Sequence, residues 1–474
     1  MRQVEVQPVP LDRLTALLTP ERALRLRDVA ERAQPMLSDR VVWNINATAQ
    51  GGGVAEMLQT LLAYGRGAGV DTRWLVLDGD PEFFAITKRL HNVLHGEPGD
   101  GGPLGAAERV HYIDLLQTNL DHMHPPVRTG DIVLLHDPQT AGLVDPLRRL
   151  GVHVVWRCHI GRDTPNDLTE RGWAFLREFI EDADGFIFSR KVYAPSWVPP
   201  ERLWVIPPSI DPFSVKNRML APAEALAVLE RCGLLDAPYR GDGLTFVRRD
   251  GSAGLLRYHD TLFAEGAPVP VDARLVVQVS RWDRLKDMAG VMRGFADAID
   301  RLPEDAHLLL VGPEVSGVAD DPEGAEVLKE CRRLWHGLPN RARRRVGLVT
   351  LPMDDGDENA HMVNAVQQYA AVVVQKSLVE GFGLTVTEAM WKGRPVVASA
   401  VGGIQDQIVD ARDGLLVGDP RDLTEFADAV GRVLRNRWFA DAVGAAARAR
   451  VQDQFLGDRH LAQYVDLFAS LLTD

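Results

Sequence analysis

Short apolar runs alternate with amphipathic stretches along most of the chain. In the first half, the runs predicted as strands are Val41–Ile45, Arg73–Leu77, Asp131–Leu135, Val152–Trp156, Gly185–Phe188 and Trp204–Ile206. In the second half, the predicted strands are Arg274–Val279, His307–Val311, Val346–Thr350, Ala371–Val374 and Pro395–Ala398. Near-continuous hydrophobicity is typical of parallel strands that helices cover on both faces. The pattern therefore predicts an α/β protein with two doubly wound domains in tandem.

Breaks in this alternation suggest the domain boundaries. We expect an N-terminal Rossmann-like domain over residues 1–212, opening with a helical lead-in over 1–40. A C-terminal Rossmann-like domain follows over 213–455, with an inserted loop or hairpin at about 241–270 that is rich in Gly, Asp and Arg. Residues 456–474 are predicted as a helix that crosses back to the first domain. Ligands of such sheets bind beyond the carboxyl ends of the strands, so we expect a site in a cleft between two facing domains.

A run of three glycines, Gly51, Gly52 and Gly53, follows the first predicted strand. Apolar residues at helical spacing come next, so the segment predicts a strand, a glycine turn and a helix. Backbone N–H groups left open at a helix N-terminus favour an anion. A dinucleotide-binding fingerprint is a competing interpretation, but that motif requires a small residue where Glu56 stands. We expect the glycines to contact a phosphate or a sugar, with a purely structural turn as the alternative.

Two cations, Arg281 and Lys286, come just after a predicted strand of the second domain. The guanidinium fork and the compact ammonium can hold separate oxygens of a diphosphate. Two solvated surface charges are the alternative interpretation for such a pair.

Two carboxylates, Glu380 and Glu388, flank a glycine-rich turn at which a helix is predicted to begin. The glycines permit a tight loop against a ligand, and the helix N-terminus can meet a phosphate. The two carboxylates can accept hydrogen bonds from the hydroxyls of a ribose and of a sugar. A stabilising effect on the helix dipole is the structural alternative for Glu388. The binding candidates in this turn are Gly381, Phe382, Gly383 and Leu384.

Composition and charge limit the class of partner and the compartment. The 474 residues are 46% hydrophobic and 25% charged, and the formal net charge of -13 argues against binding to nucleic acids or anionic membranes. Three scattered cysteines are too few for a disulfide framework or a thiolate metal site. The first residues do not resemble a signal peptide, and there is no apolar run of about 18 residues. We therefore expect a cytoplasmic protein.

The string EGFGLTVTE, from Glu380 to Glu388, resembles the glutamate-x7-glutamate signature of retaining nucleotide-sugar glycosyltransferases of family 4. The segments GDPEFFAITKRLHNVLHG, LLHDPQTAGL and VVWRCHI narrow the resemblance to the trehalose glycosyltransferring synthases. The resemblance implies the GT-B fold, in which two Rossmann-like domains face each other across a cleft. It also implies that glucose passes from a nucleoside diphosphate glucose to free glucose to give trehalose, with no cofactor and no metal.

The same resemblance assigns roles to individual residues. Arg281 and Lys286 match the pair that holds the donor diphosphate in that family. Asp137 resembles an acceptor-side acid, with an Asx turn as its structural alternative. His159 resembles a histidine beside the transferred sugar, with a buried core histidine as the alternative. His136, next to Asp137, fits binding of acceptor hydroxyls.

Arg157 and Lys88 are two further binding candidates, and each also has a structural interpretation. Arg157 alternates with His159 along its strand, which leaves packing or a salt bridge as the other option. Lys88 belongs to a stripe at helical spacing that also holds Phe84, His91 and His95, and a solvated helix face fits this stripe equally well.

The acidic run at residues 353–358 invites a metal site. We interpret it as a solvated loop, since the family that the chain resembles typically needs no bound cation.

Other functions stay open. A trehalose phosphorylase would share the fold but use inorganic phosphate, and a non-catalytic nucleotide-sugar-binding protein would keep only the pocket. A dehydrogenase is the remaining alternative, which failure to bind a nicotinamide cofactor would remove. The sequence leaves open the donor base, the acceptor beyond a glucose-like sugar, the direction of reaction, the role of the insertion and the oligomeric state, with a homodimer as one option.

Overall fold

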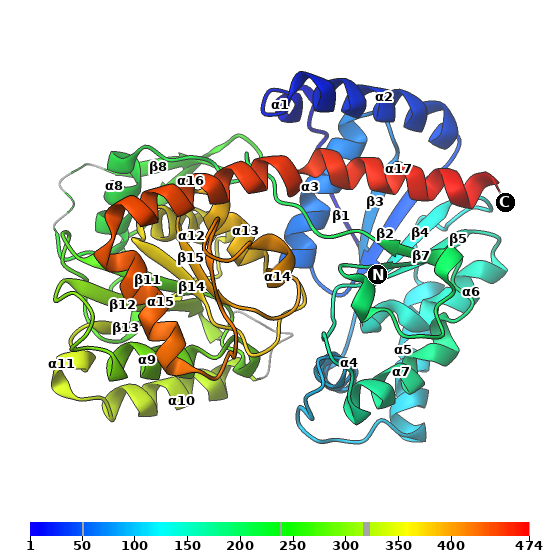
Figure 1. Ribbon diagram of the computed structural model, residues 1–474. Coiled ribbons are helices and arrows are strands. Elements are labelled where there is room, and N and C mark those ends of the chain that lie inside the picture. Colours follow the sequence, from blue (N-terminus) through cyan, green and yellow to red (C-terminus); the bar gives the residue numbers. More distant parts are fainter. Residues whose placement is uncertain (50–51, 238, 240, 242, 316–322, 474) are drawn as a thin grey trace. The chain divides into compact units, whose positions relative to one another are not determined.

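The computed structural model describes residues 1–49, 52–237, 239, 241, 243–315 and 323–473 (Figure 1). These residues form two compact units. Unit 1 comprises Met1–Ser209 and Leu456–Asp474, and unit 2 comprises Ile210–Phe455. The described part of each unit contains a seven-stranded sheet with helices on both faces, which confirms the α/β prediction.

The sheet of unit 1 has the strand order β1-β3-β2-β4-β5-β6-β7. Its strands are β1 (Arg2–Val4), β2 (Val42–Asn46), β3 (Thr72–Val76), β4 (Ile132–His136), β5 (His153–Cys158), β6 (Gly185–Phe188) and β7 (Leu203–Val205). All pair in parallel except the edge strand β1, which runs antiparallel to β3. The order reverses between β2 and β4, and ligands of such sheets bind at this kind of switch point.

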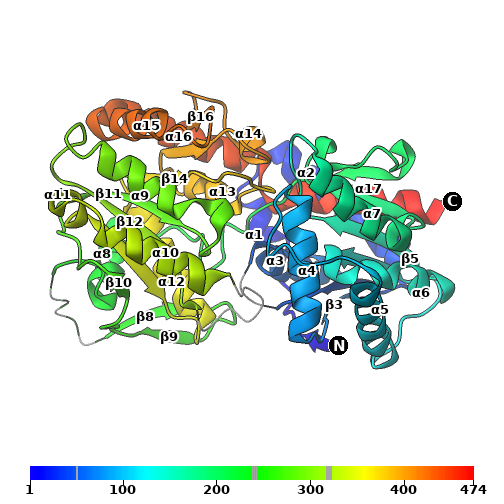
Figure 2. The ribbon, with the colours of Figure 1, turned by 90° about the horizontal axis from the view of Figure 1, so that it is seen from below.

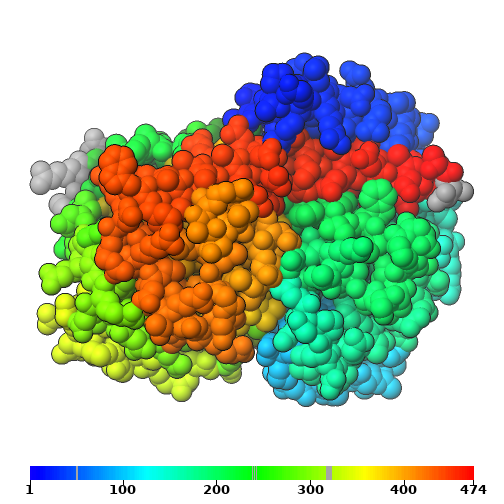
Figure 3. Space-filling view, viewed as in Figure 1, coloured from blue at the N-terminus to red at the C-terminus, as the bar shows by residue number. Residues whose placement is uncertain are grey.

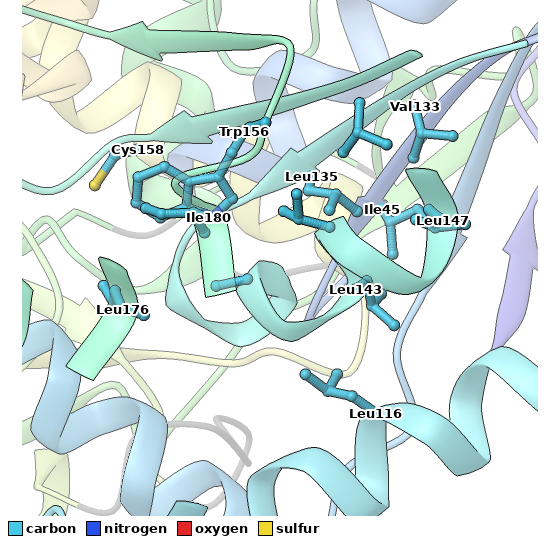
Figure 4. Close-up of a cluster of buried hydrophobic side chains, with 14 of the residues drawn as sticks. Ile45, Leu116, Val133, Leu135, Leu143, Leu147, Trp156, Cys158, Leu176 and Ile180 are labelled. Carbon is cyan, nitrogen blue, oxygen red and sulfur yellow. The ribbon is translucent and has the colours of Figure 1, made fainter. Parts of the chain in front are cut away.

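Alternate residues of these strands face two separate cores. Ile45, Val133 and Leu135 pack with Trp156 against the helices α4 (Pro81–Leu94), α5 (Ala106–Asp121), α6 (Val144–Arg149) and α7 (Asp167–Ile180), as Figure 4 shows in part. Val42 and its neighbours of the same parity pack against α2 (Pro20–Leu37), α3 (Gly53–Gly67) and α17 (Gly457–Thr473). The C-terminal α17, red in Figure 3, lies beside the blue helix α2.

The sheet of unit 2 has the order β10-β13-β12-β11-β14-β15-β16, with the edge strand β10 antiparallel to β13. Its strands are β10 (Phe263–Glu265), β11 (Arg274–Val279), β12 (Ala306–Pro313), β13 (Val346–Leu351), β14 (Val372–Gln375), β15 (Val396–Ser399) and β16 (Leu415–Val417). Its helices include α8 (Pro222–Cys232), α9 (Met288–Asp297), α10 (Gly324–His336), α12 (Gly356–Tyr369), α13 (Leu384–Trp391), α15 (Leu423–Arg435) and α16 (Arg437–Gln454). The order reverses between β11 and β14, which is the switch point of this unit.

Every strand predicted from an apolar run is present, and its ends differ from the prediction by at most two residues. The strands outside these runs are short: β1, β8 (Leu244–Val247), β9 (Ala253–Leu256), β10 and β16. Of these, β8 and β9 lie in the segment predicted as a loop or hairpin. The stretches predicted as helices after Leu11 and after the glycine run are also helical. Among the described residues, no helix is long and apolar enough to cross a membrane.

The acidic run at residues 353–358 is not a solvated loop, so that interpretation is wrong. Strands β8 and β9 form a hairpin (Figure 2), and arginines of this segment pair with the acids. Arg248 Nη1 lies 2.7 Å from Asp355 Oδ1, and Arg257 Nε lies 2.8 Å from Glu358 Oε2. Glu358 is fully buried. A buried carboxylate requires a charged or hydrogen-bonding partner, and the arginines of the hairpin supply it. These acids therefore hold the hairpin against α12.

Candidate active site

In unit 1, the acceptor-side candidates lie at the carboxyl ends of β4 and β5, next to the switch point. His136 is the last residue of β4 and is paired in register with Arg157 of β5. Side chains alternate along a strand, so Asn44, His136 and Arg157 lie on the sheet face that α3 and α17 cover. All three side chains are buried.

Asp137 follows β4 in a backbone conformation that non-glycine residues rarely adopt, with φ 63° and ψ 179°. Its Oδ1 accepts a hydrogen bond from the backbone N of His159 at 2.7 Å and caps no turn, so the carboxylate forms no Asx bond to the residues that follow it. Burial raises the pKa of Asp137 to about 7, against opposing effects of the His159 N–H and of Arg157. Strained residues of this kind cluster at functional sites, and a strain of about 1–3 kcal/mol persists only where the surroundings impose it.

His136 and His159 form a neutral hydrogen-bonded pair. His136 Nε2 lies 3.0 Å from Asn44 Oδ1, and because that oxygen only accepts, His136 Nε2 carries the proton. His136 Nδ1 then accepts from His159 Nε2 at 3.1 Å. Burial and the Arg157 cation hold the pKa of each ring well below the usual value. The partly exposed His159 is thus set as a neutral ring beside Asp137.

The glycine turn is only partly described. Gly51 lies outside the described residues, Gly52 precedes α3 and Gly53 is its first residue. A Cβ added at Gly52 would meet no atom within 4 Å among the described residues, so the turn borders open space. Lys88 lies half-buried on α4, four residues after the half-buried Phe84.

In unit 2, the donor-side candidates meet at the carboxyl ends of β11 and β14. Lys286 Nζ lies 2.6 Å from Glu380 Oε2, and Ser377 Oγ donates to the same oxygen at 3.1 Å. Arg281, one-third exposed, lies two residues past β11, with its Nη2 3.8 Å from Asp283 Oδ2. Cations that follow β11 and a carboxylate that follows β14 therefore share one edge of the sheet.

Helix α13 begins at Leu384, as predicted, directly after Gly383. Gly383 has φ 84°, and an added Cβ would lie 3.2 Å from Glu380 Cγ, so the turn that carries Glu380 requires glycine here. Glu388, in the second turn of the helix, is 1% exposed, and its Oε1 lies 3.0 Å from Lys216 Nζ. Gly381 and Phe382 are buried within the same turn.

Sequence reasoning missed several polar residues of this edge. Lys376 and Ser377 follow β14 directly, so the strand-end rule that selected Arg281 could have found them. Lys376 is fully buried and pairs with Asp287. For Lys216, which reaches Glu388 across 172 positions of the chain, no local pattern gives a signal.

The described residues contain no group of three or more His, Cys, Asp or Glu side chains that could hold a metal ion. The three cysteines are buried and unbridged. Burial raises the pKa of Cys232 to about 12, which leaves this thiol protonated at neutral pH.

Comparison with known proteins identifies the family of the chain. Residues 44–195 match the model of the trehalose synthase N-terminal domain, and residues 273–436 match the glycosyl transferases group 1 model. The trehalose synthase of Pyrococcus horikoshii is 33% identical over 97% of this chain and 96% of its own. A trehalose phosphorylase of Grifola frondosa is 26% identical over 86% of this chain and 54% of its own.

Among solved structures, an alpha,alpha-trehalose-phosphate synthase (UDP-forming) from Burkholderia vietnamiensis is similar in fold. The TM-score is 0.65 at 14% identity, over 92% of this chain and 98% of that one. The likeness shows the GT-B fold.

Proposed function

Because the chain belongs to the trehalose synthase family of glycosyltransferases, we propose that it forms trehalose from a nucleoside diphosphate glucose and free glucose, with retention at the anomeric carbon. The observation that supports this most directly is full-length similarity to a curated trehalose synthase, 33% identical over 97% of the chain. The polar groups at both switch points fit the two substrates that this reaction needs.

In this proposal, unit 2 binds the donor. Arg281 and Lys286 hold the diphosphate, and the N-terminal N–H groups of α13 add positive potential. Glu388 accepts from the ribose hydroxyls, and Glu380, 2.6 Å from Lys286, accepts from the transferred glucose. Preorganised cations of this kind stabilise the charge that develops on the leaving diphosphate without reorganising.

Unit 1 binds the acceptor in this proposal. Asp137 and the neutral His159 face the acceptor hydroxyls, and the open space beside Gly52 leaves room for a sugar. Retention requires attack on the face that the diphosphate leaves, so a leaving phosphate oxygen is positioned to take the proton of the attacking hydroxyl. The protein then supplies position and charge rather than a nucleophile.

A donor screen tests the proposal. The purified chain is incubated with glucose and each common nucleoside diphosphate glucose in turn, and the disaccharide linkage is read by NMR. We expect an α,α-linked disaccharide and one equivalent of nucleoside diphosphate. Absence of disaccharide with every donor would overturn the proposal.

Trehalose phosphorylase activity is the second candidate, because such an enzyme matches 86% of this chain at 26% identity. Trehalose incubated with inorganic phosphate would then yield glucose 1-phosphate, whereas the proposed synthase would require a nucleoside diphosphate to cleave trehalose.

A further inference from the structure

A buried arginine connects the last helix of unit 1 to the acceptor-side strand ends. Arg157, on β5, is 1% exposed, and its Nη1 donates to His460 Nε2 at 2.9 Å and to the hydroxyl of Tyr464. Its Nη2 donates to the carbonyl of Ile206 at 3.1 Å. The guanidinium fork is thus held at three points, two of which belong to α17.

Arg157 also determines which nitrogen of the His460 ring carries the proton. A guanidinium only donates, so His460 Nε2 is the accepting nitrogen and the proton lies on Nδ1, which donates to Ser209 Oγ at 2.9 Å. His460 stacks on Tyr464 with ring centroids 5.1 Å apart. Burial and Arg157 keep the pKa of His460 well below its usual value. The neutral ring therefore has one orientation that satisfies both nitrogens.

From Arg157, the connection continues to Asp137 through the backbone of β5. The N–H of Asp137 donates to the carbonyl of Arg157 at 2.8 Å, and Trp156 Nε1 donates to the carbonyl of Asp137 at 3.2 Å. The N–H of His159 holds the Asp137 carboxylate at 2.7 Å. Trp156, Arg157 and His159, at or just past the end of this strand, thus hold Asp137 in its strained conformation.

We propose that His460 and Tyr464 are positioning residues of the acceptor side, which act through Arg157 to hold Asp137 in its strained conformation. Helix α17 is then part of the acceptor site rather than only a cover for the sheet. The inference rests on the proposed function for its kinetic test.

The hydrogen-bonding groups around Arg157 support a role for this residue in fixing geometry. No carboxylate forms a salt bridge with Arg157 among the residues that the structure describes. Desolvation of a charge is costly, and even a buried ion pair often stabilises a protein no better than apolar residues of similar volume. What the arginine adds over an apolar side chain is fixed geometry, since its planar fork sets the position of β5 relative to α17.

The test compares variants of α17 that differ in contact with Arg157. Tyr464→Phe removes one acceptor and keeps the ring, and His460→Leu removes the other acceptor. His460→Gln restores an acceptor near the Nε2 position. Val465→Ala is the matched control, because this buried residue lies on the same helix in the apolar core.

For each variant we would measure kcat and KM for glucose at saturating donor, and the Kd of nucleoside diphosphate by calorimetry. We expect about a tenfold loss of kcat/KM for glucose in Tyr464→Phe and about a hundredfold loss in His460→Leu, since a displacement of about 1 Å can reduce turnover by that much. His460→Gln should recover most of the loss, and the Kd of nucleoside diphosphate should stay unchanged in all variants.

Equal kinetic losses in Val465→Ala and in the two contact variants would overturn the inference. A crystal structure of Tyr464→Phe gives a reading that does not depend on activity: we expect Asp137 to leave positive φ or to become disordered. An unchanged Asp137 there would also overturn it. If the wild-type chain makes no disaccharide, the proposed function fails, and this crystal structure alone decides the positioning role.

Discussion

Replacement of Asp137 by Asn should make the protein more stable and remove transfer. The amide oxygen can still accept from the N–H of His159, which lies 2.7 Å from Asp137 Oδ1. Asn has the same shape as Asp, so the backbone that the wild-type residue adopts at φ 63° and ψ 179° should persist. The substitution therefore removes a half-buried charge and little else, whereas the proposed acceptor site loses its carboxylate.

The size and pH dependence of the effect follow from the raised pKa. Asp137 has a pKa of about 7 in the folded chain, against an ordinary value of 3.8. Between these values the folded state holds a proton that the unfolded state has released, so wild-type stability falls as the pH rises through this range. One pKa unit corresponds to about 1.4 kcal/mol, so the raised pKa lowers the free energy of unfolding by about 4 kcal/mol when Asp137 is ionised. This destabilisation is present above pH 7 and absent below about pH 4.

Urea unfolding of the wild type and of Asp137→Asn at pH 4.5 and pH 8 tests this reasoning. Because only one residue differs, titration of the other groups cancels in the comparison. The variant should gain stability at pH 8 and gain little at pH 4.5, while Asp145→Asn, at an exposed site on α6, should show no such pH dependence. A variant that is no more stable than the wild type at pH 8, or equally stabilised at both pH values, would refute the raised pKa of Asp137.

Three further outcomes are expected. Arg281→Ala and Lys286→Ala should each lower turnover by about tenfold to a hundredfold or more, because each charge-assisted bond to the diphosphate contributes about 1.5–3 kcal/mol; steady-state kinetics at saturating glucose checks this. Glu388→Gln should weaken binding of nucleoside diphosphate in calorimetry, whereas Glu380→Gln should spare that binding and impair transfer, and equal affinity losses would contradict the assignment. Gly52→Val should leave nucleotide binding by unit 2 intact but abolish transfer, because Val is strained at φ 159° and its branched side chain would block close approach of substrate; an active variant would show that the glycine is only structural.

Much of the architecture could be predicted because parallel strands covered on both faces must be apolar almost throughout. The runs at Val41–Ile45 and Arg274–Val279, for example, place a strand of each sheet to within one residue. Short edge strands such as β10 were not predicted, because three residues are too few to show a hydrophobic pattern. The alternation of side chains along the strands also indicates a buried polar cluster, because Asn44, His136 and Arg157 interrupt apolar runs on one face of the sheet.

The sequence by itself determined the two-domain α/β fold, the helix that begins after Gly383 and the candidate residues Arg281, Lys286 and Glu380 beyond β11 and β14. Those features depend on neighbours in the chain, whose spacing is visible in the printed letters. Tertiary structure alone decided the partners: Lys286 meets Glu380 across 94 positions, and Arg157 meets His460 across 303. A buried charge requires a partner but does not specify which one, and only the folding of the chain around each sheet brings these distant side chains within hydrogen-bonding distance.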